Sequence, residues 1–302
     1  MRRLFAFLTA LCLCAGLLCG CAPAQPAAEG LSVVCTVFPA YDFVREIAGD
    51  AVNLRLLIEP GKELHTFDPT PRDMAAVAGC DLFVYVGGES DGWAETLCAE
   101  TQGTSLAMMS LVSELCAAGD GHDHDHGEYD EHIWTSPKMA AEIVCGISDA
   151  LQRLDPANAA EYAARTEAYV DKLSGLSAEL AQTVAAGSRR ELIFGDRFPM
   201  LYFTEELGLT ADAAFPGCSS ETEPSAAKLA ALIDRVRREK IPVVLKCELS
   251  SGVVAEAIAE AGGARVMTLH SCHNVTVEEW ERGESYLSLM RANILVLSEA
   301  LK

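Results

Sequence analysis

Apolar and polar positions follow two alternating patterns along the chain from residue 31 onward. Short apolar runs predict strands, and apolar positions that recur every three or four residues predict helices. In the first half, the predicted strands are 31–38, 52–58, 82–86 and 105–109, and the predicted helices are 40–48, 71–78, 91–99 and 137–151. In the second half, the predicted strands are 191–194, 210–215, 243–246 and 265–269, and the predicted helices are 199–207, 225–238, 252–261 and 285–301. This alternation predicts an α/β fold in which each half has a parallel four-stranded sheet covered by helices.

A continuous helical pattern lies between the two halves. Asp155 can cap a helix that begins at Pro156, where the missing amide donor loses no hydrogen bond, and Gly187 can end it in a left-handed turn. The predicted buried face consists of Tyr162, Thr166, Tyr169, Leu173, Leu176, Leu180 and Val184. About 32 residues at ~1.5 Å each give a rod of about 48 Å. We therefore expect one long rigid helix at 154–187, with Gly175 at a point of close packing, between an N-terminal lobe at 31–153 and a C-terminal lobe at 188–302.

The N-terminus has the features of an export signal. Arg2 and Arg3 precede an uncharged apolar stretch, 4–18, which is shorter than the roughly 20 residues of a membrane-spanning helix. The sequence Leu18-Cys19-Gly20-Cys21 resembles a bacterial lipobox, in which the cysteine after a small residue is lipidated. We expect a lipoprotein signal peptide at 1–20, lipidation at Cys21 and an Ala- and Pro-rich tether at 21–30. A plain secretory signal with incidental cysteines is the alternative.

The charge of the mature chain narrows the classes of partner. Loss of Arg2 and Arg3 leaves 21 basic and 44 acidic residues, a net charge of −23. Such a surface disfavours nucleic acid and anionic lipid as partners and attracts cations, although a soluble acidic exterior would have the same composition. The lipid on Cys21 would then be the contact with the membrane, and we expect a monomer.

Histidines at the ends of predicted strands predict a metal site. His65 follows the second strand, His132 the fourth and His270 the last, while Asp196 follows the first strand of the second half. Ligands of open parallel sheets bind outside the carboxyl ends of the strands, so two lobes facing each other would bring these four side chains to one cleft. Three imidazoles and one carboxylate suit a four-coordinate zinc ion better than magnesium or calcium.

A second group of histidines lies in an acidic segment, 120–132. His122, His124 and His126 alternate with aspartates in a segment that is too flexible and too hydrated to be the primary metal site. A merely solvated acidic loop is one interpretation, and an auxiliary metal loop, which the resemblance described below implies, is the other. His273 is either an alternate ligand or an exposed loop residue, and the second reading is favoured.

Eight cysteines remain outside the signal peptide and Cys21: Cys35, Cys80, Cys98, Cys116, Cys145, Cys218, Cys247 and Cys272. They form no CxxC pair, which disfavours a zinc ribbon, and buried free thiols are the favoured reading of Cys35 and Cys247. A disulfide or a soft metal ligand at Cys218 and Cys272 stays open.

Taken together, these segments resemble the cluster A-I substrate-binding lipoproteins of ABC importers for zinc or manganese. The matching pieces are the lipobox at Cys21, the motif 60–71 around His65, the His-rich acidic loop, the segment 130–134, Asp155-Pro156 with Tyr162, the turn 220–225 and Ser285-Tyr286-Leu287. The resemblance implies an extracytoplasmic, lipid-anchored protein that captures a divalent metal and delivers it to an ABC permease and its ATPase. It also implies that the His-rich loop collects zinc.

The chain departs from this family at two ligand positions. The family's third ligand is usually His or Glu, where this chain has Gly195-Asp196-Arg197, and Asp196 is the candidate, with a structural Asp-Arg pair as the alternative. The fourth is usually Asp, where this chain has His270, a change that favours zinc over manganese.

Two other classes of protein compete with the import role. An adhesion or storage lipoprotein without a transporter would share every feature named so far. A secreted zinc hydrolase is disfavoured because the chain has no His-Glu-x-x-His motif, and we expect no enzyme activity.

Overall fold

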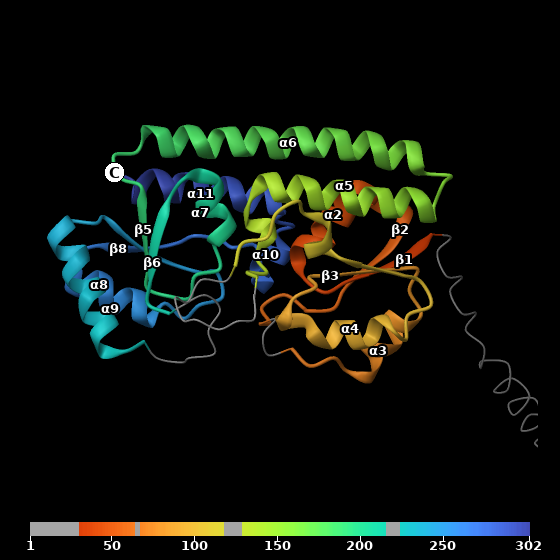
Figure 1. The fold of residues 1–302 in the computed structure, drawn as a ribbon, viewed down its shortest axis with the longest axis horizontal. Coiled ribbons are helices and arrows are strands. Elements are labelled where there is room, and N and C mark those ends of the chain that lie inside the picture. Colours follow the sequence, from red (N-terminus) through yellow and green to blue (C-terminus); the bar gives the residue numbers. More distant parts are fainter. Residues whose placement is uncertain (1–29, 64–66, 118–128, 216–223) are drawn as a thin grey trace, which may run out of the picture. The chain divides into compact units, whose positions relative to one another are not determined.

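The structure is a computed structural model that describes residues 30–63, 67–117, 129–215 and 224–302. Residues 31–302 form one compact unit. Its first sheet consists of β1 (Leu31–Cys35), β2 (Val52–Leu56), β3 (Leu82–Tyr85) and β4 (Thr104–Ala107), in the order β2-β1-β3-β4 with every pairing parallel (Figure 1). These are the four predicted strands, with ends two to three residues earlier at β1 and β2.

The second sheet repeats this topology. Its strands are β5 (Glu191–Phe194), β6 (Thr210–Ala213), β7 (Val243–Lys246) and β8 (Arg265–Thr268), in the order β6-β5-β7-β8, again all parallel. The bounds of β5 and β7 agree with the sequence prediction. In each sheet, the first strand lies between the second and the third, so the strand order reverses at the first strand. Open parallel sheets bind ligands at such a point.

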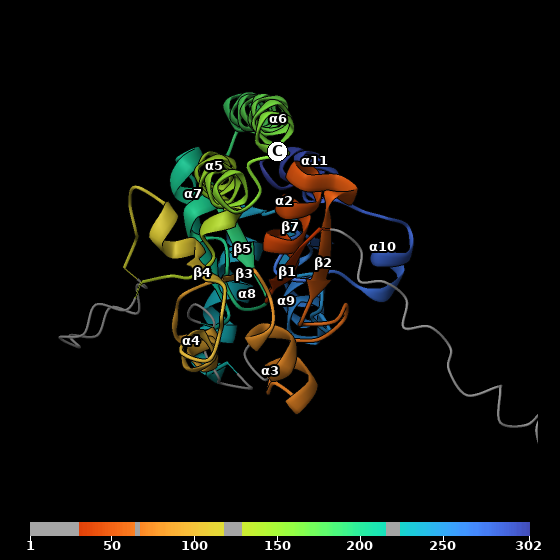
Figure 2. The same ribbon diagram turned by 90° about the vertical axis from the view of Figure 1, so that its right-hand side faces the viewer.

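Helices cover both faces of each sheet. In the N-terminal lobe, α2 (Phe38–Ala48) and α5 (Pro137–Leu154) lie on one face, and α3 (Pro71–Ala78) and α4 (Gly92–Cys98) lie on the other (Figure 2). The C-terminal lobe has α7 (Leu201–Leu207), α8 (Ala226–Glu239), α9 (Val253–Gly262) and α11 (Tyr286–Ala300), together with a short helix that the sequence analysis missed, α10 (Val277–Glu281). Four short 3-10 turns, Gly49–Ala51, Glu89–Asp91, Met108–Leu111 and Ile133–Thr135, complete the described helices. The predicted α/β fold with two parallel four-stranded sheets is confirmed.

The long helix α6 (Ala159–Ala186) runs above both lobes (Figure 1). Its buried residues are the seven that the periodicity predicts, Tyr162, Thr166, Tyr169, Leu173, Leu176, Leu180 and Val184. It packs against α2 and α5 of the N-terminal lobe and against α7 and α11 of the C-terminal lobe. Its 28 residues correspond to about 42 Å.

Three details of this helix differ from the prediction. The helix begins at Ala159 and not at Pro156, and residues 156–158 form a turn before it. The Asp155 carboxylate accepts hydrogen bonds from the Tyr162 hydroxyl and from the Asn158 side chain. Gly187 is extended, with φ −71° and ψ 151°, and not left-handed. A side chain at Gly175 would meet nothing within 4 Å, so this glycine does not mark close packing.

The two lobes share one hydrophobic core beneath α6. Residues of α2, α5, α6 and α11 belong to this core together with inward-facing residues of both sheets, such as Val84 and Leu245. Hydrogen bonds also cross between the lobes: the Tyr286 hydroxyl donates to the Trp134 carbonyl at 2.7 Å, and the Trp134 indole donates to the Ser271 carbonyl at 3.0 Å. The lobes are therefore packed as one body. Among the described residues, no helix is both long enough and apolar enough to cross a membrane.

Candidate metal site

His132 lies just before the 3-10 turn Ile133–Thr135 and is 3% exposed. Its Nδ1 is 3.0 Å from Oδ1 of Asp130, which also accepts the backbone N–H of His132 at 2.8 Å. The Tyr202 hydroxyl of the C-terminal lobe donates to the Asp130 carbonyl at 2.7 Å and so fixes this segment from the other side. A carboxylate on one ring nitrogen is the usual arrangement of a metal-binding histidine, so His132 is oriented as such a ligand would be.

His273 brings a second imidazole to His132 from the opposite lobe. The two ring centroids are 5.2 Å apart with the planes at 80°, and both rings pack against Trp134 at 5.5 Å. Two imidazoles on one tetrahedral zinc, each bound at about 2.0–2.1 Å, have ring centroids roughly 5 Å apart. The prediction that His273 is an exposed loop residue is wrong, because its side chain is half-buried. The ring separation of 5.2 Å from His132 is compatible with two imidazoles on one ion.

His270 is buried and makes its contacts inside the C-terminal lobe. The backbone N–H of Cys272 donates to its Nδ1 at 2.9 Å, and its Nε2 is 3.5 Å from Oε2 of Glu279. Burial lowers the pKa of His270, but the nearby carboxylate of Glu248 and further contacts outweigh it and raise that pKa well above its usual value. The same contact with His270 lowers the pKa of Glu279 to about 2. Both nitrogens of this predicted ligand are therefore engaged with other groups.

Asp196 lies after β5, as predicted, and uses its carboxylate within its own lobe. Oδ1 accepts the backbone N–H of Arg197 at 2.9 Å, and Oδ2 accepts the backbone N–H of Cys247 at 3.0 Å. These bonds join the loops that follow β5 and β7. The structure thus brings His132 and His273 together and gives His270 and Asp196 other partners.

The segment before His65 is tied to the His273 loop. The Asn274 side chain donates to the carbonyls of Glu59 and Lys62 at 2.9 and 2.8 Å, and the Gly61 N–H donates to the Val275 carbonyl at 2.7 Å. His65 itself lies outside the described residues, as do His122, His124, His126, Cys21 and Cys218. Within the described ranges, no group of three or more His, Cys, Asp or Glu side chains is placed to hold a metal ion.

The prediction of buried free thiols is confirmed for one of the two cysteines. Cys35 is a fully buried free thiol, as expected, whereas Cys247 is only half-buried. Cys272 is buried with its thiol free and has φ of 57°, a value that side chains other than glycine rarely adopt. It therefore shapes the loop between His270 and His273.

Sequence reasoning missed Glu248, which lies two residues after β7 and contacts the same loop. The strand-end rule that selected His65 and Asp196 applies equally to this position. A single glutamate after a strand has no distinctive motif that would mark it as part of a site.

Comparisons with known proteins identify relatives of the whole described unit. Residues 33–300 match the model of a family described as ZnuA, zinc-uptake complex component A periplasmic. The chain is 29% identical over 310 residues to the high-affinity zinc uptake system protein ZnuA of Bacillus subtilis, covering 98% of this chain and 96% of that protein. It is also 29% identical over 297 residues to the zinc-binding lipoprotein AdcA of Streptococcus pneumoniae serotype 4. That match covers 95% of this chain and 59% of AdcA, so the chain spans about three fifths of that relative.

Solved structures agree with these matches. The zinc(II)-bound ZnuA-like domain of Streptococcus pneumoniae AdcA superimposes with a TM-score of 0.75 at 28% identity, covering 90% of this chain and 99% of that one. The laminin-binding protein Lmb of Streptococcus agalactiae, described as a bifunctional protein with adhesin and metal transporting activity, has a TM-score of 0.78 at 27% identity. It covers 90% of this chain and 100% of that one.

Proposed function

The chain belongs to the ZnuA family of periplasmic components of zinc-uptake complexes, and we propose that it captures one zinc ion outside the cytoplasm and delivers it to an ABC importer. The family description is that of an uptake component and not of an enzyme. Zinc is the cargo in this proposal. The zinc(II)-bound state of the pneumococcal ZnuA-like domain supports it, since that domain shares the fold along nearly its full length.

The observation that carries the proposal is the pair of imidazoles from opposite lobes. His132 is oriented by Asp130, and His273 faces it across the junction of the lobes at a ring separation of 5.2 Å. Imidazole ligands favour zinc over magnesium and calcium, which prefer oxygen. We propose that His132, His273 and His65 bind the ion, with His65 on the segment that Asn274 ties to the same loop.

The two other predicted ligands have supporting roles in this proposal. His270 and Asp196 hold the loops after β8 and β5 in place through their bonds to Cys272, Arg197 and Cys247. A mononuclear site with three imidazoles keeps its fourth position for a water molecule or a carboxylate. Manganese, which prefers oxygen ligands, is then a poorer cargo.

The proposal extends to the location of the protein. Cys21 would carry the lipid that holds the protein on the outer side of the bacterial cell membrane, and the permease and its ATPase would be its partners. The lipoproteins and uptake proteins among the relatives support this arrangement. The auxiliary zinc loop around His122, His124 and His126 belongs to the same proposal.

Titration of the purified protein with zinc and with manganese, each in competition with a chelator, tests the cargo. We expect one tight zinc equivalent and weaker manganese binding. Deletion of the gene should slow growth in zinc-depleted medium, and added zinc should restore it. Equal affinity for both metals, or normal growth of the deletion strain without zinc, would contradict the proposal.

A second candidate function is adhesion. It is favoured by the similarity to Lmb, whose description combines adhesin and metal transporting activity. Binding of the protein to immobilised laminin, compared between zinc-loaded and zinc-free samples, tests it. Adhesion without any zinc binding would make this the primary function.

A further inference from the structure

Glu248 holds the loop that carries His273. Its side chain is 4% exposed and extends from the segment after β7 toward the loop after β8. Oε2 accepts the Ser271 N–H at 2.9 Å. Oε1 accepts the Ser271 hydroxyl at 2.7 Å and the His273 N–H at 3.2 Å. One buried carboxylate thus accepts three hydrogen bonds from two residues of one loop.

The loop needs such a clamp because of its backbone conformation. Cys272, between the two residues that Glu248 binds, has φ of 57°. A non-glycine residue in this region is strained, and the conformation persists only where its surroundings enforce it. On one side, the hydrogen bonds to Glu248 hold the loop in this conformation. On the other side, the Cys272 N–H donates a hydrogen bond to Nδ1 of His270.

The clamp also decides where the His273 ring lies. The backbone N–H of His273 itself donates to Glu248, and also to the Ser271 hydroxyl that Glu248 binds, so these bonds fix the origin of the side chain that reaches His132. Hydrogen bonds to an ionised carboxylate are roughly twice as strong as neutral ones. Without them, the strained residue next to His273 can relax, and the ring loses its fixed position.

We infer that Glu248 is the positioning residue of the metal site: it fixes His273 at ligand distance from His132 through the loop 271–273. This inference rests on the proposed function, since it takes zinc as the cargo and His273 as a ligand. Glu248 does not touch the metal in this arrangement. Residues that orient metal ligands change affinity by about 10- to 100-fold when they are replaced.

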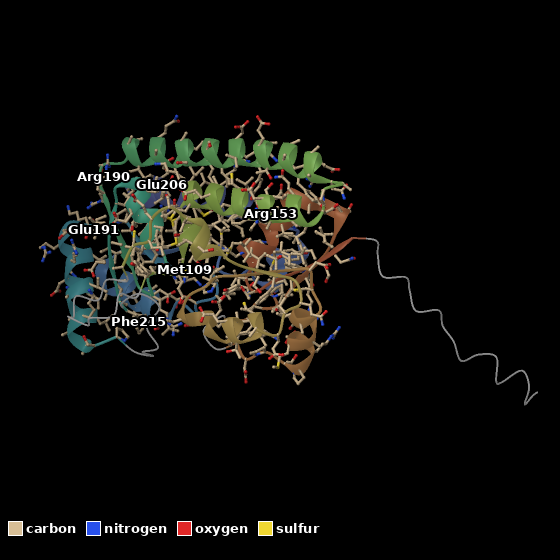
Figure 3. The ribbon with its side chains drawn as sticks, turned by 45° about the vertical axis from the view of Figure 1, so that its right-hand side comes forward. Met109, Arg153, Arg190, Glu191, Glu206 and Phe215 are labelled. Carbon is tan, nitrogen blue, oxygen red and sulfur yellow. The ribbon has the colours of Figure 1, made fainter. Side chains whose placement is uncertain are left out.

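The test compares Glu248→Ala and Glu248→Gln with a matched control, Glu191→Ala. Glu191, labelled in Figure 3, is a partly buried glutamate that pairs with Arg235. It is the first residue of β5, whereas the loop follows the last residue of β8 in the same parallel sheet, so the two lie at opposite ends of the strands. Zinc affinity is measured by chelator competition, and the visible absorption spectrum of the cobalt(II) protein reports the geometry of the site. Glu248→Ala should bind zinc about 10- to 100-fold more weakly with an altered cobalt spectrum. Glu248→Gln, which keeps one acceptor oxygen, should fall between Glu248→Ala and wild type, and Glu191→Ala should match wild type.

A double variant separates positioning from general damage to the lobe. If Glu248 acts through His273, Glu248→Ala should weaken zinc binding no further once His273→Ala is present. Additive losses, or wild-type affinity and cobalt spectrum in Glu248→Ala, would overturn the inference. If Glu248→Ala does not fold, as judged by circular dichroism, the same comparison is made with Glu248→Gln. Failure of the wild-type protein to bind zinc would instead refute the proposed function.

Discussion

The two lobes share one sheet topology and differ in the charge and support of the loops at their sheet edges. Residues 31–153 contain 21 acidic and 6 basic residues, a net charge of −15, whereas residues 188–302 contain 17 and 13, a net charge of −4. The strand orders β2-β1-β3-β4 and β6-β5-β7-β8 are equivalent. The chain therefore uses one scaffold twice, with most of its negative charge in the first copy.

The two lobes also differ in the contacts that hold their histidine segments. His132 of the N-terminal lobe is held by one local carboxylate, Asp130, and by the hydroxyl of Tyr202 from the other lobe through the Asp130 carbonyl. The His273 loop of the C-terminal lobe is held by a buried carboxylate of its own lobe, Glu248. A negative lobe attracts cations over a distance, and a fixed loop lowers the cost of ordering a ligand. The two lobes therefore differ in net charge, whereas each holds its own histidine segment with a carboxylate, Asp130 in the first and Glu248 in the second.

The largest expected effect is on zinc affinity after removal of one ligand from either lobe. His132→Ala and His273→Ala should each weaken binding by more than ~100-fold, about 2.7 kcal/mol, because residues that merely orient ligands already cost 10- to 100-fold. His270→Ala should weaken it less, since both ring nitrogens contact groups other than a metal. Chelator competition measures all three variants.

His270→Gln is the control for this series, because it keeps a polar group in the same place. A greater loss in His270→Ala than in His273→Ala would reverse the assignment of the C-terminal ligand. It would then restore the ligand that strand-end reasoning selected.

The fold was predictable because its signals are local. Seven buried positions on α6 follow from the spacing of Tyr162 through Val184, since a helix repeats every 3.6 residues. The start of α6 was not predictable, because residues 156–158 form a turn whose contacts, such as the hydrogen bond from the Tyr162 hydroxyl to Asp155, follow no period. Caps depend on such individual contacts, and periodicity contains no information about them.

The site was predictable only as far as the ends of strands. That rule places His132 and the loop after β8 at the carboxyl edges of the two sheets, and it cannot separate His270 from His273, three residues apart. Between them lies Cys272 in the left-handed conformation, and His273, not His270, packs against His132. The residues on either side of Cys272 contact Glu248, which follows a different strand, so the sequence contains no local signal for this conformation.

The next largest effect concerns the junction between the lobes. Glu206 of α7 accepts hydrogen bonds from the Ser136 hydroxyl and the Lys138 N–H at the start of α5, and from the Ser177 hydroxyl of α6 (Figure 3). Glu206→Ala should lower the free energy of unfolding by about 1 kcal/mol or more, because two part-buried hydroxyl donors and one exposed N–H lose their partner. Denaturant titration measures it, with the exposed neighbour variant Glu205→Ala as control.

The same titration tests whether the lobes unfold together. A shared core predicts one cooperative transition for wild type and for Glu206→Ala. Two separate transitions in wild type would show that the lobes are independent despite their common helix.

A smaller effect distinguishes the lobes by their response to pH. Burial raises the pKa of Asp91 in the N-terminal lobe to about 6, so protonation stabilises the fold below about pH 3.8 and this contribution is lost as pH rises through about 6. The contact with His270 lowers the pKa of Glu279 in the C-terminal lobe to about 2. Its contribution is therefore present above about pH 4.5 and is lost as pH falls toward 2. Asp91→Asn should flatten the first dependence and Glu279→Gln the second, as measured by denaturant midpoints at pH 7, 5 and 3.

These two variants are controls for each other. Asp91→Asn should leave the acid limb of the profile unchanged, and Glu279→Gln should leave the limb between pH 4 and 6 unchanged. Parallel changes in both limbs would mean that the two lobes do not titrate separately.

The smallest expected effect is on the tight site after deletion of residues 121–127 from the N-terminal lobe. The deletion removes His122, His124 and His126 together with Asp123 and Asp125, so weaker additional zinc binding should disappear. The affinity of the tight site for zinc should change by less than about twofold. Ordering a loop costs conformational entropy, and this cost does not enter the affinity of a site that does not use the loop. Chelator competition gives the affinity, and equilibrium dialysis in zinc excess gives the stoichiometry. Unchanged stoichiometry would show that the loop adds only charge to the acidic lobe, whereas a large loss of tight affinity would place one of its histidines in the site itself.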